Sequence, residues 1–235
     1  VNGYKNSVTD GSFNQITGKE NTSSSNSQSF ISGTKNNVTS NNASSILGST
    51  NTVSGSKNTL VQGNTNTTSN SEYSMVTGKS NSTTSGLGVI VSGNNNTILS
   101  EQESLIVGKD NNVSSGTNNS VQGLNNNSNT NTSSLITGKN NVVANNTTVS
   151  VFGSSHDISV NSVNTLVGGN QNSETTGTNN AIFGNLNKSS STSNTITGGN
   201  TNTSNTVVNS LIIGQNHTST SLSHGLVSGN NNTVS

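Results

Sequence analysis

Ile16-Thr17-Gly18-Lys19-Glu20-Asn21 decides the fold, because its order of an aliphatic residue, a glycine and an asparagine returns along the whole chain. Counted from Gly18, a glycine stands at every fifteenth position, and one 16-residue step after Gly153 is the single exception. The anchor glycines defined in this way are Gly3, Gly18, Gly33, Gly48, Gly63, Gly78, Gly93, Gly108, Gly123, Gly138, Gly153, Gly169, Gly184, Gly199, Gly214 and Gly229. A fixed period of this length is typical of stacked coils in a solenoid.

Two further positions repeat with the glycine. Two residues before it stands Val or Ile, at Val1, Ile16, Ile31, Ile46, Val61, Val76, Val91, Ile106, Val121, Ile136, Val151, Val167, Ile182, Ile212 and Val227. Thr197 departs from this pattern, and Ile196 with Gly198-Gly199 leaves the register there open by one residue. Three residues after the glycine stands Asn, at Asn6, Asn21, Asn36, Asn51, Asn66, Asn81, Asn96, Asn111, Asn126, Asn141, Asn172, Asn187, Asn202 and Asn232, with His156 and His217 in the two remaining places.

The repeat predicts an all-β parallel solenoid, or β-roll, of about 16 stacked 15-residue coils that occupies residues 1–235 as a single domain. A unit of this length is too short for a helical pair, and Val, Ile and Thr favour strands. We expect two short strands and two turns in each coil. A weaker apolar position five residues after the glycine is occupied by Val8, Val38, Val53, Ile98, Val113, Val143, Ile158 and Val234.

Each repeated residue type has a physical role in such a stack. The Val and Ile column is expected to face inward, and the glycine to mark a tight corner that needs a positive φ or leaves no room for a Cβ. Stacked asparagines can exchange amide hydrogen bonds and form an internal ladder. A neutral histidine offers one donor and one acceptor, so His156 and His217 can replace asparagine in it.

A second apolar column stands three residues before the glycine, at Phe30, Leu60, Met75, Ile90, Leu105, Leu135, Leu166, Ala181, Ile196, Leu211 and Leu226. Neighbouring residues of a strand point to opposite faces, so this column is expected to face outward. Soluble monomers seldom expose a large apolar patch. The sequence therefore predicts a homo-oligomer with its axis along the stack.

The pattern resembles the YadA-like head repeats of trimeric autotransporter adhesins, which carry a Ser-Val-Ala-Ile-Gly type core at about 14-residue spacing. The matching stretches are Ser104-Leu105-Ile106-Val107-Gly108, Ser134-Leu135-Ile136-Thr137-Gly138 and Ser210-Leu211-Ile212-Ile213-Gly214. The resemblance implies a left-handed parallel β-roll, three identical chains side by side, and display on a bacterial surface for adhesion. The 15-residue period, the asparagine column and the lack of a neck, stalk or membrane anchor depart from the family.

The composition excludes several classes of protein. Hydrophobic residues make up 24% and charged residues 7% of the chain, against roughly 45–50% and about 25% in an ordinary domain. There is no Pro and no Cys, and the net charge is zero. Without cysteine there is no disulfide framework, and without arginine or net charge nucleic-acid binding is disfavoured. No apolar run is long enough for a membrane helix.

Isolated motifs do not add up to a catalytic site. Thr77-Gly78-Lys79-Ser80 is similar to the end of a phosphate-binding loop, but Tyr73 stands where that motif needs a glycine. Lys19, Lys109 and Lys139 follow their own anchor glycines in the same phase and are expected to be solvated. His156 and His217 lie four coils apart and cannot share a metal, while His224 stands outside the column; all three are expected to be structural.

Other acidic and polar residues are equally unpromising for catalysis. Glu101 and Glu103 are expected on one strand face, without a cleft or an acid–base partner. Asp10, Asp110 and Asp157 share no phase, which argues against a calcium-binding repeat. The many Asn-x-Ser/Thr triplets follow from composition alone. We therefore expect no enzymatic activity, cofactor or metal.

Two functions stay open. The first is an extracellular surface adhesin head that attaches to host or neighbouring cells, and the second is a purely structural fibre segment that acts as a rigid spacer. Ice binding through flat threonine rows is a third class, weakened because no single position repeats Thr faithfully.

The chain has no atypical capping repeats, which solenoid ends normally need, so it is expected to be an excised segment or an end-to-end stacking subunit. Export and anchoring parts are then expected outside it. The repeat is irregular at the insertion within His156 to Gly168 and at the aromatic residues Tyr4, Tyr73, Phe152 and Phe183. Phe152 and Phe183 are expected to fill space at the contact between chains rather than to bind a ligand.

Overall fold

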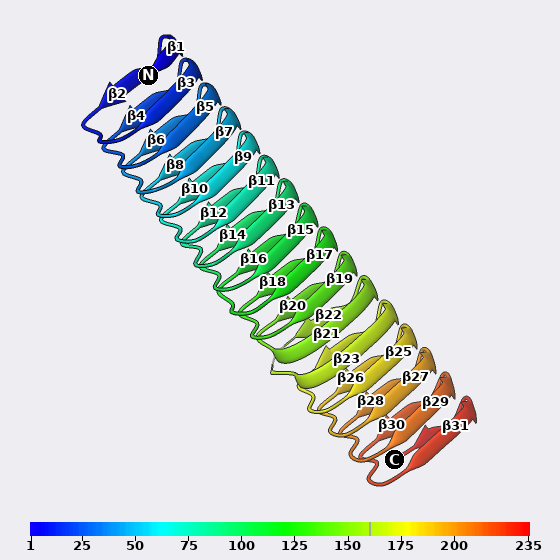
Figure 1. Cartoon of the computed structure of the whole chain (residues 1–235). Coiled ribbons are helices and arrows are strands. Elements are labelled where there is room, and N and C mark those ends of the chain that lie inside the picture. The colour runs from blue at the N-terminus through cyan, green and yellow to red at the C-terminus, as the bar shows by residue number, and fades with distance from the viewer. Residues whose placement is uncertain (160) are drawn as a thin grey trace. The chain divides into compact units, whose positions relative to one another are not determined.

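The computed structural model describes residues 1–159 and 161–235, in which every helix or strand assigned is a β-strand. The chain divides into two compact units, Val1–Thr117 and Asn118–Ser235. In each unit the coils stack so that odd-numbered strands form one parallel sheet, sheet A, and even-numbered strands form another, sheet B (Figure 1). This confirms the all-β parallel solenoid with coils of about 15 residues. A single domain over 1–235, a left-handed coil and a trimer stay predictions.

In the first unit, sheet A contains β1 (Asn2–Tyr4), β3 (Gln15–Lys19), β5 (Phe30–Thr34), β7 (Ser45–Ser49), β9 (Leu60–Asn64), β11 (Met75–Lys79), β13 (Ile90–Asn94) and β15 (Leu105–Lys109). Sheet B contains β2 (Ser7–Thr9), β4 (Thr22–Ser24), β6 (Asn37–Thr39), β8 (Thr52–Ser54), β10 (Thr67–Ser69), β12 (Ser82–Thr84), β14 (Thr97–Leu99) and β16 (Asn112–Ser114).

In the second unit, sheet A contains β17 (Ser120–Leu124), β19 (Leu135–Lys139), β21 (Thr147–Ser154), β23 (Val163–Asn170), β25 (Ala181–Asn185), β27 (Ile196–Asn200), β29 (Leu211–Gln215) and β31 (Leu226–Asn230). Sheet B contains β18 (Asn127–Asn129), β20 (Val142–Ala144), β22 (Asp157–Ser159), β24 (Ser173–Thr175), β26 (Lys188–Ser190), β28 (Thr203–Asn205), β30 (Thr218–Thr220) and β32 (Thr233–Val234).

The 15-residue period becomes an in-register parallel pairing. Val76 of β11 pairs with Val61 and Val91 on its two sides, so identical positions lie on top of one another. Both aliphatic columns face inward, and their members within the stacks are fully buried, as at Val76 and Val53. Thr197 is buried between Ile182 and Ile212, which resolves the register that the sequence left open.

Each complete coil changes direction at three residues with a positive φ, called here corners, so the expected number of two turns is wrong. In the coil that follows Gly63 the corners are Thr65, Asn70 and Tyr73, whose φ angles are 59°, 49° and 51°. Between the second and third corners, one residue forms an isolated β-bridge to the equivalent residue of the neighbouring coil, as Glu72 does with Lys57. The left-handed corners are carried mostly by Asn, Ser, Asp, Lys and Thr rather than by glycine, which the sequence pattern could not reveal.

The anchor glycine lies inside a strand of sheet A and not at a corner, which corrects its expected position. Both expected reasons for glycine nevertheless hold. Gly78 has a φ of 113°, and a Cβ added there would collide with the carbonyl oxygen of Gly93 in the next coil. A side chain would therefore separate the two coils at this point.

The single 16-residue coil, in the second unit, takes up its extra residue between Ser159 of β22 in sheet B and Val163 of β23 in sheet A. Ala144 still pairs with Ser159 at a spacing of 15, whereas Thr147 pairs with Val163 at a spacing of 16. From there the normal register continues, and Gly153 lies opposite Gly169. The insertion expected within His156 to Gly168 thus lies in the connection between the two sheets and leaves the pairing of β22 and the glycine column intact.

Candidate functional site

The predicted ladder of asparagine amides runs through the interior of each unit and is called here the inner asparagine ladder. Oδ1 of Asn66 accepts hydrogen bonds from the backbone N–H and from Nδ2 of Asn81, at 3.0 and 3.2 Å. Nδ2 of Asn81 also donates to the carbonyl oxygens of Thr77 and Gly93, at 2.9 and 3.0 Å. One side chain therefore ties its own corner to both neighbouring coils.

Histidine replaces asparagine in this ladder as expected. Nδ1 of His156 accepts the backbone N–H of Asn172 at 3.1 Å, and Nε2 lies 3.2 Å from the carbonyl oxygen of Phe152. This arrangement requires a neutral ring with its proton on Nε2. Burial lowers the pKa of His156, and this effect is larger than the opposing effect of the hydrogen bonds to the backbone. His217 makes the equivalent contacts, with Nδ1 accepting from the backbone N–H of Asn232 at 3.2 Å.

A second buried row, polar in most coils, was missed by sequence reasoning and lies eight residues after the anchor glycine, or nine in the 16-residue coil, where it is Ser162. Asn41 donates its backbone N–H to Oδ1 of Asn26 at 2.8 Å, and Ser56 donates to Oδ1 of Asn41 at 2.7 Å. The backbone N–H of Ser71 then donates to Oγ of Ser56 at 3.3 Å. Because Asn, Ser, Thr, Gly and Glu all occur there, and Val207 and Leu222 replace them in two coils, no single residue type marked the row.

The two glutamates expected on one strand face lie on opposite sides of the chain. Glu101 belongs to the second buried row, where it accepts hydrogen bonds from the backbone N–H of Gly116 at 2.6 Å and from Oγ of Ser104 at 2.9 Å. Glu103 lies outside, at a corner with a φ of 48°. The expectation was wrong because the corner interrupts the alternation of a strand.

Glu174 is a second interior carboxyl, at a position that most coils give to an aliphatic or hydroxyl side chain. Burial raises its pKa, and the hydrogen bond that Nδ2 of Asn180 donates to Oε1 at 2.6 Å opposes this shift. The side chain has no exposed surface. An enclosed carboxyl of this kind has a structural rather than a catalytic setting.

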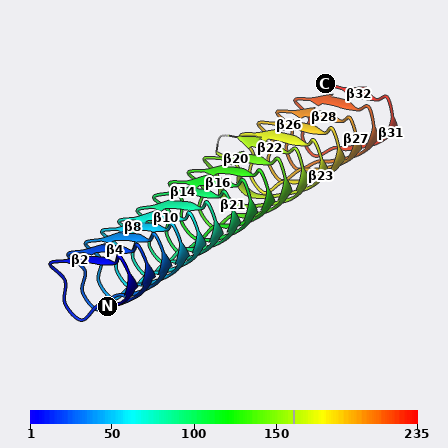
Figure 2. The same ribbon diagram turned by 90° about the horizontal axis from the view of Figure 1, so that it is seen from above.

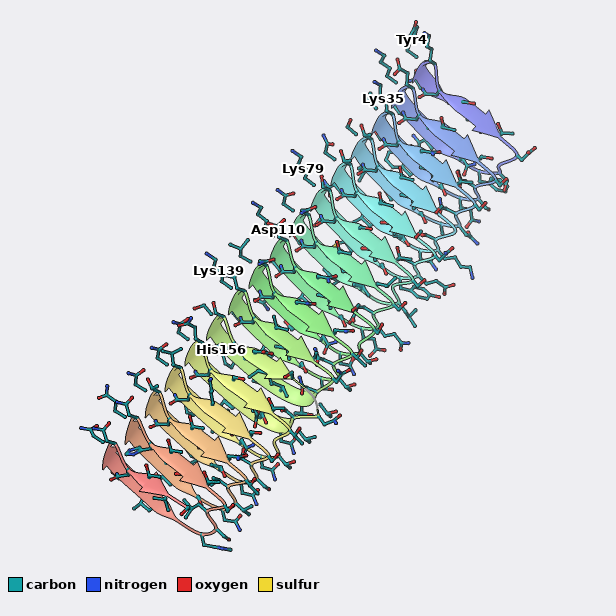
Figure 3. All side chains as sticks on the ribbon, turned by 180° about the vertical axis from the view of Figure 1, so that it is seen from behind. Tyr4, Lys35, Lys79, Asp110, Lys139 and His156 are labelled. Atoms are coloured by element: carbon teal, nitrogen blue, oxygen red, sulfur yellow. The ribbon has the colours of Figure 1, made fainter. Side chains whose placement is uncertain are left out.

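The remaining motifs are surface features. Gly78 and Lys79 end the strand β11 and Ser80 forms the next corner, so no phosphate-binding loop precedes a helix here. Lys35, Lys79 and Lys139 project away from the coils in Figure 3. The Nζ atom of Lys19 lies 3.5 Å from Oε1 of Glu20, and that of Lys35 lies 3.9 Å from Oε2 of Glu20. In residues 1–159 and 161–235 no group of three or more His, Cys, Asp or Glu side chains is placed to hold a metal ion.

The outward apolar column is confirmed as a surface feature of sheet A and is called here the aliphatic row. Ile90 is 41% exposed and Leu226 is 69% exposed, while Leu60 and Leu105 are half-buried. Each residue pairs with its equivalent in the next strand, as Met75 does with Ile90. An aliphatic surface therefore lies on the outer face of sheet A, without interruption from Leu60 to Leu105 in the first unit and from Leu166 to Leu226 in the second. Elsewhere Gln15, Ser45, Ser120 and Ser150 occupy the same position.

Sheet B of the first unit presents a different surface, called here the hydroxyl face. Its strands, among them β2, β4, β8 and β10, follow one another along one side of the coils (Figure 2). The middle residue of each strand faces inward and the first and third face outward. Seven successive strands each contribute one threonine to this face: Thr9, Thr22, Thr39, Thr52, Thr67, Thr84 and Thr97. Serine is the second outward residue in five of the seven strands, and no residue of the face is charged.

The second unit carries exposed amide rows. At the corner before sheet A, Nδ2 of Asn179 donates to Oδ1 of Asn194, and Nδ2 of Asn194 donates to Oδ1 of Asn209, at 3.0 and 2.9 Å. Nδ2 of Asn209 lies 3.1 Å from Nε2 of His224, which places this histidine on the surface and outside the inner ladder. A shallow groove of about 530 Å³ runs between this row and the aliphatic side chains, lined by Asn194, Ile196, Asn209, Leu211, His224 and Leu226.

The fold defines the class of protein, a parallel β-solenoid built from coils of about 15 residues whose interior holds a ladder of amides. The sequence matches no known family model, and no curated protein matches it. Within the part of the chain that the structure describes, no helix is long and apolar enough to cross a membrane. The aliphatic row, the hydroxyl face and the exposed amide row are extended surfaces on which another molecule can bind.

Proposed function

We propose that this chain is a non-catalytic segment of an extracellular adhesin head or fibre, displayed at a cell surface and attached through parts outside this sequence. The observation that carries the proposal is the aliphatic row, which repeats at the same place in successive strands and is open to solvent. An apolar strip of this length is a contact surface rather than an ordinary monomer surface. A second copy of the same chain, in a trimer as in the YadA-like heads, is the partner that covers it.

Light scattering after size-exclusion chromatography tests the association. The wild-type chain should have the mass of a trimer, and Ile90→Lys with Leu105→Lys should reduce it to that of a monomer with unchanged circular dichroism. Thr52→Lys, on the hydroxyl face, is the matched control and should leave the mass unchanged. A folded wild-type monomer would remove the support that the aliphatic row gives to the proposal.

The same preparation separates the adhesin from the spacer. Beads coated with the chain should attach to cells if it is an adhesin head. Beads that do not attach, although the chain on them is folded and oligomeric, would favour a purely structural fibre segment.

Ice binding is a second candidate function, and the hydroxyl face favours it. Threonine does not repeat at one sequence position because it alternates between the first and third residues of the strands, as at Thr52 and Thr84, which share one face. Strands about 4.8 Å apart and outward residues about 7 Å apart along a strand make a regular uncharged grid of hydroxyl and methyl groups. Such a grid can hold water in an ordered, ice-like layer.

Inhibition of ice recrystallisation tests this candidate. Thr52→Tyr with Thr67→Tyr would break the flat grid and should abolish the inhibition. Thr77→Tyr, on the outer face of sheet A, should leave it unchanged. Equal activity of all three proteins, or none in the wild type, would eliminate ice binding as a function of this face.

A further inference from the structure

Phe152 and Phe183 form an aromatic surface on sheet A of the second unit, at a position where the other coils carry no aromatic residue. Both stand directly before an anchor glycine, in β21 and β25, and they are 40% and 43% exposed. Gly168 of β23 lies between them in register. These three residues are called here the phenylalanine platform.

Gly168 is present because of the neighbouring ring rather than because of its backbone. Its φ is not in the left-handed region, unlike that of the anchor glycines. A Cβ added to Gly168 would stand 3.1 Å from Cδ1 and 3.4 Å from Cε1 of Phe183. The Phe183 ring therefore leans over the backbone of Gly168, and a side chain there would lift it away from the sheet.

A row of amides accompanies the platform two residues further along the same strands. Nδ2 of Asn170 donates to Oδ1 of Asn185, and Nδ2 of Asn185 donates to Oδ1 of Asn200, both at 3.3 Å. Oγ of Ser154 donates to Oδ1 of Asn170 at 2.7 Å. These hydrogen bonds hold the amides in place and leave further donor and acceptor capacity towards solvent.

The combination matches the chemistry of a neutral sugar chain. A pyranose ring has an apolar face of C–H groups that stacks on an aromatic ring, and hydroxyl groups at its edge that bond to amides. The backbone positions of Phe152 and Phe183 are two strands apart, about 9.6 Å at the usual strand spacing. This is close to the two-sugar repeat of an extended β-1,4-linked chain, in which alternate rings present the same face.

Charge also favours this ligand. The outward residues of sheet A from β21 to β31, including the amide row, contain no charged side chain. Lys139 of β19, which pairs with Ser154, lies at the edge of this surface, and one lysine supplies too little positive charge to favour an anionic glycan or a nucleic acid. The platform is also displaced along the strands from the aliphatic row, which lies two residues earlier, as at Leu166 relative to Gly168.

We propose that the phenylalanine platform and the adjoining amide row bind an extended neutral β-1,4-linked polysaccharide, such as cellulose or chitin. This rests on the proposed adhesin function and names the ligand of one of its surfaces. The rings supply stacking, the amides select the orientation of the chain, and the inner ladder keeps the face rigid, so that little conformational entropy is lost on binding.

Retention on insoluble cellulose and chitin tests the proposal with the whole chain. The wild type should be retained on at least one of them, and Phe152→Ala with Phe183→Ala should weaken retention at least tenfold. Gly168→Thr keeps both rings but lifts that of Phe183, and should also weaken retention. Leu47→Ala, at the equivalent position in the first unit, is the matched control and should bind as the wild type does.

Three outcomes would overturn the proposal. Wild-type protein that is not retained on either polysaccharide, or phenylalanine variants that bind normally, would show that the platform is not a glycan site. If these variants instead lower the mass measured by light scattering, the platform is a contact between copies. Cell attachment by coated beads without retention on polysaccharide would leave the adhesin function in place and remove only this ligand.

Discussion

At the scale of single residues, the inner asparagine ladder concentrates the hydrogen bonding of each coil in one side chain. Asn81 bonds to the coil before it through Oδ1 of Asn66 and to the coil after it through Gly93 and Asn96. A chain with so few apolar residues depends on these buried contacts, because an unpaired buried polar group costs about 1–3 kcal/mol.

Asn81→Ala should therefore lower the free energy of unfolding by about 2–4 kcal/mol, since the backbone N–H of Asn96 and the carbonyl oxygens of Thr77 and Gly93 lose their partner. Asn81→His is the matched control, because His156 fills the same place with one acceptor and one donor. Urea denaturation should show the smaller loss for the histidine variant. Equal losses would mean that side-chain volume, and not hydrogen bonding, decides this position.

His156 should make stability depend on pH. Its folded pKa lies below that of the unfolded chain because it is buried, so the unfolded state binds the proton first. Stability is then fully present above about pH 6.5 and falls as the pH decreases towards the folded pKa. The melting temperature of the wild type should drop relative to His156→Asn between pH 7.5 and pH 5.5. Parallel pH profiles of the two proteins would contradict this.

Glu174 should have the opposite pH dependence. Its folded pKa is raised by burial, so the folded state holds the proton more tightly than the unfolded state. Stability decreases as the pH rises from about 4.5 through the folded pKa. Glu174→Gln should thus be more stable than the wild type at pH 7.5, and the difference should shrink towards pH 4. Chemical denaturation at the two pH values measures it, and a difference that does not change with pH would show that ionisation plays no part.

At the scale of the strand, the anchor glycine sets how closely the coils of sheet A approach. Gly78→Ala should cost about 3 kcal/mol or more, because it combines a strained φ with a collision against the next strand. Gly229→Ala is the matched control: its φ is 106°, yet a Cβ there would meet only Nδ2 of Asn232, at 3.7 Å. It should cost about 1–2 kcal/mol. Thermal unfolding compares the two, and similar losses would show that conformational strain alone explains the column.

At the scale of the whole molecule, the core is one narrow aliphatic column and a second column of mixed aliphatic and hydroxyl side chains, between further polar rows. Apolar surface raises the heat capacity of unfolding and polar surface lowers it, with a usual net value of about 12–15 cal/mol/K per residue. The chain should therefore unfold with less than about 10 cal/mol/K per residue. Differential scanning calorimetry measures this quantity, and an ordinary value would indicate that additional apolar surface is buried, for example between copies.

Much of the interior follows from the sequence by itself. The period of 15 predicts in-register pairing, because only that pairing stacks like upon like. It also predicts the buried Val and Ile columns, the asparagine ladder and the fit of His156 and His217, since each of these needs only the identity of the residues above and below. The all-β solenoid was therefore predictable from 16 short motifs.

Only the tertiary structure decided where the outward and inward positions change over. Left-handed corners at residues such as Thr65, Asn70 and Tyr73 break the alternation of a strand, and their residue types are too varied to mark them in the sequence. For this reason Glu101 and Glu103 were misplaced, the second buried row was missed, and the threonines of the hydroxyl face were scattered over two sequence positions. The repeat of the sequence determines which residues stack on one another in successive coils. The conformation of the corners determines whether each side chain faces the interior or the solvent.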